Sequence, residues 1–465
     1  MATGLMDLIL AGNDWLNNLV WGPPFMILLV GTGLFLTIRL GFFQFTHLRF
    51  AWRRSFGLAF RRGTDTEGAI SPLQAVASAM AATVGVGNIA GVATALALGG
   101  PGAIFWMWAV ALVGMATKFA EAALGVKYRQ VLPSGQVLGG AFYYIERGVG
   151  WKWLAVLYAV FAGFASLGIG NMVQANTMAH ALETGFGISS FLTGGVAMVL
   201  VGIVTLGGIT RIAVTAERIV PAMAIFYILA SLTLLAVNFA AVPAAFASIF
   251  HHAFTPAAPA GGFAGAGVLM AVRYGVARGI FSNEAGLGSA SIAHAQARNS
   301  PGGQGLWGMW EVAIDTLVIG TMTALVILVS GALEEGVTGA ELATQAFSSG
   351  LPGIGGLIVL VALVLFSYTT MLTWGFYGEQ SFHYLFGRSS TLPYRVIFLL
   401  FIFIGAVGGL EVVWDLADTL NGLMAAPNLI ALIVLSGVVA RERTAVLSEA
   451  AKEKLTKMSA KDRAS

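Results

Sequence analysis

Two glycine-interrupted stretches contain residues with which this chain could bind a ligand deep in a membrane. The first lies in an apolar segment over residues 72–98 and reads Ala82-Thr83-Val84-Gly85-Val86-Gly87-Asn88-Ile89-Ala90-Gly91. Each glycine costs a helix about 1 kcal/mol relative to alanine, so we expect the helix to break here. In lipid, a broken backbone is tolerated only where it faces protein or a water-filled cavity, and there its free N–H and C=O groups can hold a ligand. Close packing of small residues against another helix is the competing interpretation.

The second stretch lies in an apolar segment over residues 265–293 and reads Gly275-Val276-Ala277-Arg278-Gly279-Ile280-Phe281-Ser282-Asn283-Glu284-Ala285-Gly286-Leu287-Gly288. A carboxylate such as Glu284 is costly at membrane depth and is by default a functional hypothesis. We expect it to pair with Arg278 or Arg273, or to cap the second half of its own helix. Two interrupted segments at matching places in two halves of a chain are the best sequence indication of a secondary-transporter site.

Such a site has a recognisable chemistry. Half-helix N-termini favour a carboxylate, whereas unwound carbonyls and half-helix C-termini coordinate a small cation. Thr369 and Thr370 could add hydroxyl ligands for sodium, although threonine in a membrane helix commonly bonds back to its own helix. The amide of Gln174 could meet the polar end of an amino acid or bond a neighbouring helix, and Trp374 could wall the pocket or serve only in packing.

Other polar residues near the breaks have similar alternatives. Ser282 and Asn283 follow the second break and are interpreted as ligand or gate residues, while Phe281 could line the pocket or pack in the core. Three further acids are interpreted as members of polar networks near the cytoplasmic side and not as a catalytic acid pair: Glu121 near Lys118, and Glu311 one helical turn before Asp315.

The composition requires these residues to be positioned by membrane helices. The chain has 465 residues, of which 57% are hydrophobic and 10% are charged, whereas a soluble domain carries about 25% charged residues. It has no cysteine, which excludes disulfides, thiol chemistry and cysteine metal sites. The six histidines form no metal-ligand spacing. The N-terminus has no basic region typical of a cleavable signal peptide, so we expect the first helix to be retained.

Eleven membrane-length segments are predicted, and their loops differ in charge. The segments cover residues 21–40, 72–98, 103–126, 153–179, 188–207, 215–239, 265–293, 308–332, 354–377, 393–410 and 418–439. Of the 25 lysines and arginines, all but Arg273 and Arg278 fall at or near alternate loops or helix ends, and the opposite loops have none. This asymmetry predicts an N-terminus outside and a cytoplasmic C-terminus. It is a membrane pattern, so we expect no nucleic-acid partner.

The order of the segments predicts two inverted halves. Apart from the first helix, ten segments divide into two sets of five, and each set begins with an interrupted helix of opposite direction. The predicted parts are an extra N-terminal helix with a basic cytoplasmic linker (1–71), a first repeat (72–239), an extracellular loop with room for a short interfacial helix (240–264), a second repeat (265–439) and a basic cytoplasmic tail (440–465).

The chain closely resembles the alanine or glycine:cation symporter family, also called the sodium:alanine symporters. Five stretches in the family's order carry the resemblance and cover nearly the whole chain. They are Thr83-Val84-Gly85-Val86-Gly87-Asn88-Ile89-Ala90-Gly91-Val92-Ala93-Thr94-Ala95, Gly99-Gly100-Pro101-Gly102-Ala103-Ile104-Phe105-Trp106-Met107-Trp108, Gly170-Asn171-Met172-Val173-Gln174-Ala175-Asn176, Gly279-Ile280-Phe281-Ser282-Asn283-Glu284-Ala285-Gly286-Leu287-Gly288 and Trp374-Gly375-Phe376-Tyr377-Gly378-Glu379. Where the family often has a second threonine between the glycines, this chain has Val86.

The resemblance implies an all-α polytopic membrane protein of the leucine-transporter type, a 5+5 inverted repeat with one extra N-terminal helix. It also implies that Gln174, Thr370 and Trp374 line the substrate pocket together with the two breaks. The predicted substrate-binding residues are Thr83, Gly85, Gly87, Asn88, Gln174, Phe281, Ser282, Asn283, Thr370 and Trp374. The predicted sodium ligands are Thr83, Val84, Gly87, Asn88, Thr369 and Thr370.

The predicted function is sodium-driven uptake of alanine or glycine by alternating access across a bacterial or archaeal plasma membrane. Sodium is the co-transported ion, and no organic cofactor is expected. A proton-coupled carrier of the same fold is the near alternative, and Glu284 would then have to titrate. An ion channel is disfavoured because the polar residues do not repeat as a ring or filter. An enzyme is disfavoured because the chain lacks a nucleophile–base pair or a metal cluster. The sequence does not indicate an oligomeric state.

Overall fold

The computed structural model describes residues 2–58, 67–255, 267–408 and 411–462. The rest of the predicted basic linker (59–66), part of the predicted extracellular loop (256–266) and the end of the tail (463–465) lie outside the described residues. The described chain is almost entirely helical. One antiparallel pair of short strands, β1 (Gln130–Val131) and β2 (Val137–Leu138), lies in the connection after α7.

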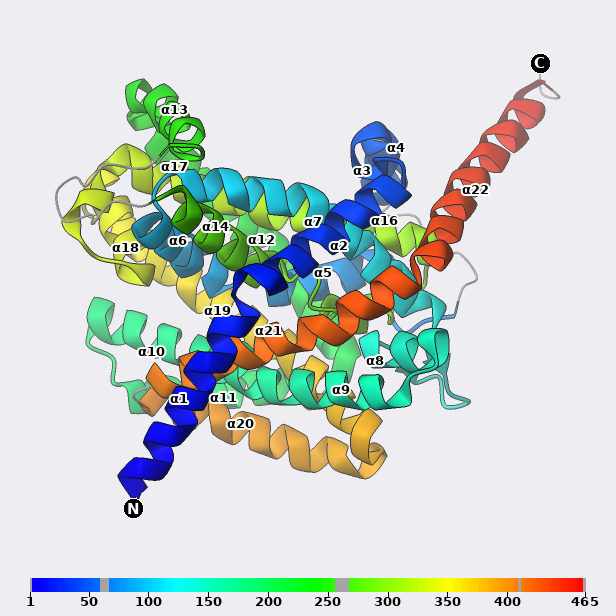
Figure 1. The fold of residues 1–465 in the computed structure, drawn as a ribbon, viewed down its shortest axis with the longest axis horizontal. Helices are drawn as coiled ribbons and strands as arrows, with labels where there is room; N and C mark the ends of the chain where they lie inside the picture. The colour runs from blue at the N-terminus through cyan, green and yellow to red at the C-terminus, as the bar shows by residue number, and fades with distance from the viewer. Residues whose placement is uncertain (1, 59–66, 256–266, 409–410, 463–465) are drawn as a thin grey trace.

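The helices run across the molecule in Figure 1, so that successive connections alternate between its two ends. The first half contains α1 (Ala2–Val20), α2 (Pro23–Arg39), α3 (Phe43–Thr46), α4 (Leu48–Ser55), α5 (Pro72–Thr83), α6 (Val92–Gly99), α7 (Gly102–Lys127), α8 (Ala141–Tyr144), α9 (Lys152–Leu167), α10 (Val173–Phe186), α11 (Ser190–Thr205), α12 (Gly208–Val237) and α13 (Val242–His252). The second half contains α14 (Val268–Asn283), α15 (Ala290–His294), α16 (Pro301–Val312), α17 (Thr321–Ser330), α18 (Gly339–Gly350), α19 (Gly355–Phe386), α20 (Thr391–Val407), α21 (Glu411–Val434) and α22 (Ser436–Asp462).

Eight described helices are long and apolar enough to cross a membrane, and the bent pair Pro72–Thr83 and Gly87–Gly99 makes nine. The two other predicted spans correspond to α11, a shorter apolar helix, and to α14 with α15, which are separated by a break. Large apolar side chains remain exposed on the outer helices, including Phe191, Leu200, Leu229 and Leu400, as expected for surfaces that face lipid. The chain is a multi-pass membrane protein, and the count of eleven spans stays a prediction.

Four segments that the sequence places in loops or a tail contain helices. Residues 1–20 were expected to precede the first span, but α1 continues toward α2 and packs on α21, where Asn17 donates to the Thr419 hydroxyl at 3.1 Å. Within the predicted outer loops, α13 and α18 lie at one end of the bundle (Figure 1). The predicted basic tail begins as α22, which projects from the opposite end.

Residues 67–70, before α5, pair with residues 295–298, after α15, and we call these two paired segments the strap. Ile70 forms a parallel bridge with Ala297, and the Arg298 amide donates to the Ile70 carbonyl at 2.8 Å. The Arg129 guanidinium donates to the carbonyls of Ala295, at 2.9 Å, and Ala297 on one side and of Glu67 on the other. One side chain therefore holds both strands of the strap.

Replacing Arg129 with alanine is expected to open the strap, because hydrogen bonds to a charged group contribute about 1.5–3 kcal/mol each. The chain has no cysteine, so a cysteine placed at the buried Ile70 would be its only thiol. We expect maleimide to label that thiol at least about tenfold faster in Arg129→Ala, because about 1.4 kcal/mol is tenfold in an equilibrium. The control is Arg147→Ala, whose arginine donates to the Gln130 side chain in the same region. Equal labelling rates in both variants would contradict this role of Arg129.

Candidate functional site

The first predicted break is present between α5 and α6. The two parts of this apolar segment are bent by 52° relative to each other. The helix α5 ends at Thr83, and the Asn88 side chain accepts a hydrogen bond from the Gly85 amide at 3.0 Å. The chain then continues through one π-helical turn, η2 (Gly87–Gly91). The side chain of Asn88 thus replaces a backbone acceptor that the interrupted helix lacks.

The second predicted break is also present, directly after α14. Glu284 adopts the left-handed conformation with φ 55°, and helix resumes only at α15. Gly286 and Gly288 have φ values of 101° and 79°, which residues with a side chain rarely adopt. The Asn283 side chain accepts from the Ala285 amide at 2.9 Å. The backbone from residue 284 to residue 289 is therefore open to other partners.

A buried carboxylate joins the two breaks. Asp315 lies in the π-helical segment η6 (Ala313–Gly320) and has no exposed surface. The Asn88 amide of the first break donates to its Oδ1 at 2.8 Å and to its carbonyl at 3.0 Å. Ser282, at the second break, donates to its Oδ2 at 2.9 Å, as does Thr316 at 2.8 Å. Sequence reasoning placed Asp315 in a cytoplasmic-side network and missed this position, although an acid inside an apolar span was a usable signal.

The two threonines predicted to bind sodium face different partners. Thr370 on α19 donates to the Ala81 carbonyl of the first broken helix at 3.1 Å. The hydroxyl of Thr369 instead donates to two carbonyls of its own helix, those of Leu365 and Phe366, at 3.1 Å each. Of the other predicted ligands, Thr83 donates to the Ala79 carbonyl of its own helix at 3.4 Å. The structure thus brings Thr370 against the first break and leaves the hydroxyl of Thr369 on its own helix.

Gln174 and Trp374 lie on the helices next to the breaks. Gln174 lies in the first turn of α10, just after the π-helical turn η4 (Gly168–Met172), and its Nε2 donates to the Ile169 carbonyl at 3.0 Å. Its Oε1 is buried and has no hydrogen-bond partner among the described residues. A buried acceptor without a partner costs about 1–3 kcal/mol, so this atom is suited to a ligand that brings a donor.

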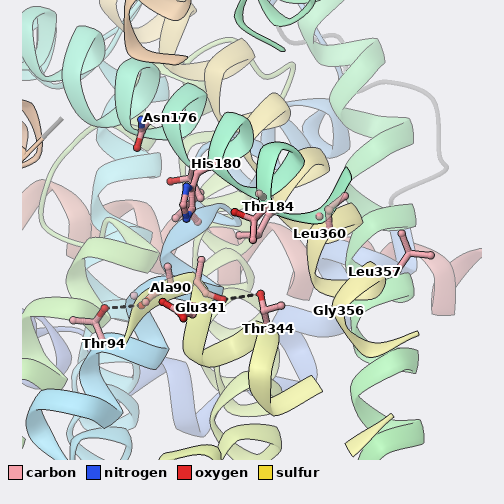
Figure 2. A pocket seen from close by; sticks show the side chains of 18 of the residues that line it. Ala90, Thr94, Asn176, His180, Thr184, Glu341, Thr344, Gly356, Leu357 and Leu360 are labelled. Atoms are coloured by element: carbon pink, nitrogen blue, oxygen red, sulfur yellow. Dashed lines mark hydrogen bonds between the residues drawn. The ribbon is translucent and has the colours of Figure 1, made fainter. Parts of the chain in front are cut away.

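A cavity of about 910 Å³ approaches the breaks from the end of the bundle that carries α18. Figure 2 shows α10 on one side of it, with Asn176, His180 and Thr184, and α18 on the other, with Glu341 and Thr344. Of the predicted substrate-binding residues, Phe281 lines this cavity, as does Val86 from the first break. The remaining candidates are not among its lining residues.

The acids near the second break do not have the predicted partners. The expected ion pair of Glu284 with Arg278 or Arg273 does not form among the described residues. Arg278 lies over the Phe281 ring at 5.4 Å, and Arg273 donates to the Asn18 side chain at 3.4 Å. Glu284 instead accepts hydrogen bonds from two uncharged donors, the Trp374 indole at 3.0 Å and the Ser289 hydroxyl.

Glu121 supports the open backbone of the second break. Its Oε1 accepts from the amides of Gly286, at 2.9 Å, and Gly288, at 3.0 Å, and from the Asn428 side chain at 2.7 Å. These bonds satisfy amides that would otherwise belong to a helix ladder. Glu121 therefore stabilises the break, whereas the sequence suggested only a network near the cytoplasm.

Lys118, which the sequence places near a helix end, is fully buried within α7. Its Nζ lies 3.1 Å from Glu311 Oε1, and the other oxygen of Glu311 lies 2.8 Å from His294 Nε2. The Gln304 amide nitrogen lies 2.8 Å from His294 Nδ1, so both ring nitrogens of His294 have a partner. Glu311 is therefore held by Lys118 on one oxygen and by His294 on the other.

Replacing Lys118 with methionine is expected to lower the free energy of unfolding by about 3–5 kcal/mol, because Glu311 would keep a buried charge without a cation. The measurement is the midpoint of thermal unfolding in detergent. The matched control is Lys127→Met, since Lys127 pairs with Glu442 at 3.0 Å but its side chain is 48% exposed, and such pairs contribute about 0–1 kcal/mol. Similar midpoints for the two variants would show that the buried pair is not needed.

The comparisons with known proteins agree with this geometry. The model of the sodium:alanine symporter family matches residues 6–460. The sodium/alanine symporter AgcS of Methanococcus maripaludis is 48% identical over 451 residues, which cover 95% of this chain and 97% of that protein. A putative sodium/proton-dependent alanine carrier protein of Bacillus subtilis, YrbD, is 40% identical over 440 residues, covering 90% of this chain and 89% of the relative.

Among solved structures, MhsT in complex with L-phenylalanine matches with a TM-score of 0.55 and 14% sequence identity, over 82% of this chain and 99% of that one. At this identity the likeness concerns the fold alone. Together with the two broken helices, it confirms the predicted fold of the leucine-transporter type. The family match and the relatives extend over nearly the full length, so the chain belongs to the sodium:alanine symporter family.

Proposed function

We propose that this protein couples the entry of sodium to the uptake of alanine or glycine by alternating access. The observation that carries the proposal is the buried contact of Asp315 with both helix breaks, through Asn88 and Ser282. A negative charge fixed between two open backbones provides a place where a cation and a zwitterion can bind side by side. Membership of the sodium:alanine symporter family supports the same ion and substrate.

The proposed cation site uses the oxygens around the first break. Sodium is a hard cation, and oxygen ligands from carbonyls, amides, hydroxyls and carboxylates suit such ions. We assign these to Thr83, Val84, Gly87, Asn88, Thr369 and Thr370. Asp315 is added to this set because its carboxylate already accepts a hydrogen bond from Asn88. Thr370 contributes most directly among the hydroxyls, since it reaches the first break across helices.

The proposed amino acid site lies between the breaks. Its carboxylate would lie at a half-helix N-terminus, and its ammonium group would supply the donor that Gln174 Oε1 lacks. We assign substrate contacts to Thr83, Gly85, Gly87, Asn88, Gln174, Phe281, Ser282, Asn283, Thr370 and Trp374. The bulk of Trp374, which is 2% exposed, would limit the side chain of the substrate to a small one.

Alternating access requires the site to open to one side at a time. The cavity under α18 supports a path to Phe281 from one end, and we assign closure of the other end to the strap that Arg129 holds. The cavity end is extracellular in the proposed orientation, with the N-terminus outside and the C-terminus in the cytoplasm of a bacterial or archaeal cell. The loop charges support this direction. The membrane potential would contribute about 2.3 kcal/mol per charge per 100 mV.

Labelled alanine uptake into proteoliposomes tests the proposal, with either an inward sodium gradient or an inward proton gradient. Concentrative uptake that requires sodium and is lost in Thr370→Ala is the expected result. A proton-coupled carrier is the second candidate, because a relative is described as sodium/proton-dependent and because Glu121 and Glu284 are buried. Uptake driven by protons alone would establish that candidate, and no concentrative uptake of alanine or glycine by folded protein would overturn both.

A further inference from the structure

The indole of Trp374 is held by one specific hydrogen bond. Its Nε1 donates to Glu284 Oε1 at 3.0 Å, and both residues are buried. A buried indole N–H without a partner is costly, so this bond selects one orientation of the ring. The contact joins α19 to the second break, which lies 90 residues earlier in the chain.

Packing holds Trp374 from two sides, since its ring also lies edge-to-face against Tyr377 at 5.5 Å between centroids. A Cβ atom added at Gly170 would lie 2.2 Å from Trp374 Cβ and Cγ, so the base of the side chain touches the π-helical turn η4 directly. Trp374 also lies one helical turn after Thr370 on α19, so both side chains share a face of that helix. Since Thr370 donates to the first break and Trp374 donates to Glu284 at the second, this face of α19 meets both breaks.

Glu284, which accepts the indole hydrogen bond, is held both through its backbone and through its second carboxylate oxygen. Glu284 has a left-handed backbone, and its amide donates to the Ile280 carbonyl at 2.8 Å. Its second oxygen accepts from the Ser289 hydroxyl, at the start of the short helix α15. Because Glu284 is held in this way, the position of the broken backbone determines where its oxygen meets the Trp374 indole.

We propose that Glu284 is a positioning residue that holds the Trp374 indole across the substrate pocket and so restricts transport to small amino acids. The inference rests on the proposed function and adds to it the residue that sets the size limit. Glu284 acts here through the length and the acceptor oxygen of its side chain. Its charge is not required for this role.

Two substitutions of Glu284 distinguish the effect of its side-chain length from the effect of its charge. Glu284→Gln keeps the length and an acceptor oxygen for the indole but removes the charge. Glu284→Asp keeps the charge but is one methylene shorter, so its oxygen no longer reaches the indole from the fixed backbone. A positioning residue therefore predicts that Gln preserves the size limit and Asp relaxes it. A group that binds the coupling proton predicts instead that Gln abolishes coupled uptake and that Asp retains it, because only Asp can still titrate.

The measurement is the ratio of kcat/KM for alanine to kcat/KM for leucine, from sodium-driven uptake into proteoliposomes. We expect Glu284→Asp to lower this ratio about tenfold, the size of effect that one methylene has in a shaped pocket. Glu284→Gln is expected to keep the ratio of the unchanged protein. The matched control is Glu146→Asp, since Glu146 also accepts a hydrogen bond from an aromatic side chain, the Tyr384 hydroxyl at 2.8 Å.

Ser289→Ala provides a second route to the same question, because it frees the far oxygen of Glu284 without changing the pocket. We expect it to lower the ratio in the same direction and to have no further effect in Glu284→Asp, as residues acting through one contact are not additive. If Glu284→Asp does not fold, the ratio measured for Ser289→Ala tests the positioning role instead. An unchanged ratio in the folded variants would overturn the positioning role, while absence of sodium-driven uptake in the unchanged protein would overturn the proposed function instead.

Discussion

Asp315→Asn is expected to reduce sodium-driven alanine uptake at least about a hundredfold. The substitution removes the negative charge that lies between the two breaks, within hydrogen-bond distance of Asn88 and Ser282. Two unit charges 4 Å apart interact by about 4 kcal/mol at an effective dielectric constant of 20, and about 2.8 kcal/mol corresponds to a hundredfold. Asparagine also directs an amide N–H₂ group toward the place where a cation is proposed to bind.

The measurement is the initial rate of uptake at saturating alanine as the sodium concentration is varied. Asp14→Asn is the matched control, because Asp14 lies exposed on α1. The control should behave as the unchanged protein, whereas Asp315→Asn should require far more sodium. An Asp315→Asn protein with the normal sodium dependence would mean that the bond between the breaks is structural only.

Gly85→Ala is expected to raise the sodium concentration for half-maximal uptake about fivefold. A Cβ atom at this position would lie 2.6 Å from Thr370 Oγ1, where ordinary contacts begin near 3.4 Å. The Thr370 hydroxyl would have to leave the Ala81 carbonyl, to which it donates at 3.1 Å, and losing one such hydrogen bond costs about 1 kcal/mol. Displacement of Thr370 therefore separates α19 from the first break.

Two comparisons control this experiment. Gly31→Ala adds the same methyl group on α2, where no atom lies within 4 Å, and should leave uptake unchanged. In the double variant with Thr370→Ala, where no uptake is expected, the comparison uses the midpoint of thermal unfolding: the clash disappears, so adding Gly85→Ala should lower the midpoint much less than it does in the unchanged protein. Equal losses from Gly85→Ala with and without the threonine hydroxyl would show that the glycine is needed for the backbone of the break and not for contact with Thr370.

Much of the fold was predictable because its signals are local. Glycines and polar residues inside apolar segments predicted both breaks, because a helix exposed to lipid does not tolerate a broken backbone or unsatisfied polar groups. The helix α18 was missed, although a usable pattern exists, since Leu342, Ala343, Ala346 and Phe347 recur at helical spacing and are buried. The helix α1 is not predicted, because residues 1–20 precede the first membrane-length apolar segment.

The partners of the buried acids could not be predicted from spacing. Asp315 meets Asn88, which is 227 residues away, and Glu121 meets Asn428, which is 307 residues away. Such contacts depend on how helices from both halves pack, and no periodicity within one segment contains that information. Two arginines lie near Glu284 in the sequence, but in the structure Glu284 accepts a hydrogen bond from Trp374, which is 90 residues away along the chain. The sequence shows that these acids are costly in an apolar segment, but it does not show which residues they contact or what they do.

The most direct test of the account is equilibrium binding of labelled alanine and of sodium to the purified protein, each measured with and without the other. If the two breaks and Asp315 form one joint site, sodium must raise the affinity for alanine, and alanine must raise the affinity for sodium by the same factor. We expect a factor of at least about tenfold in the unchanged protein and a factor near one in Asp315→Asn. An alanine affinity that does not depend on sodium in the unchanged protein would contradict the joint site.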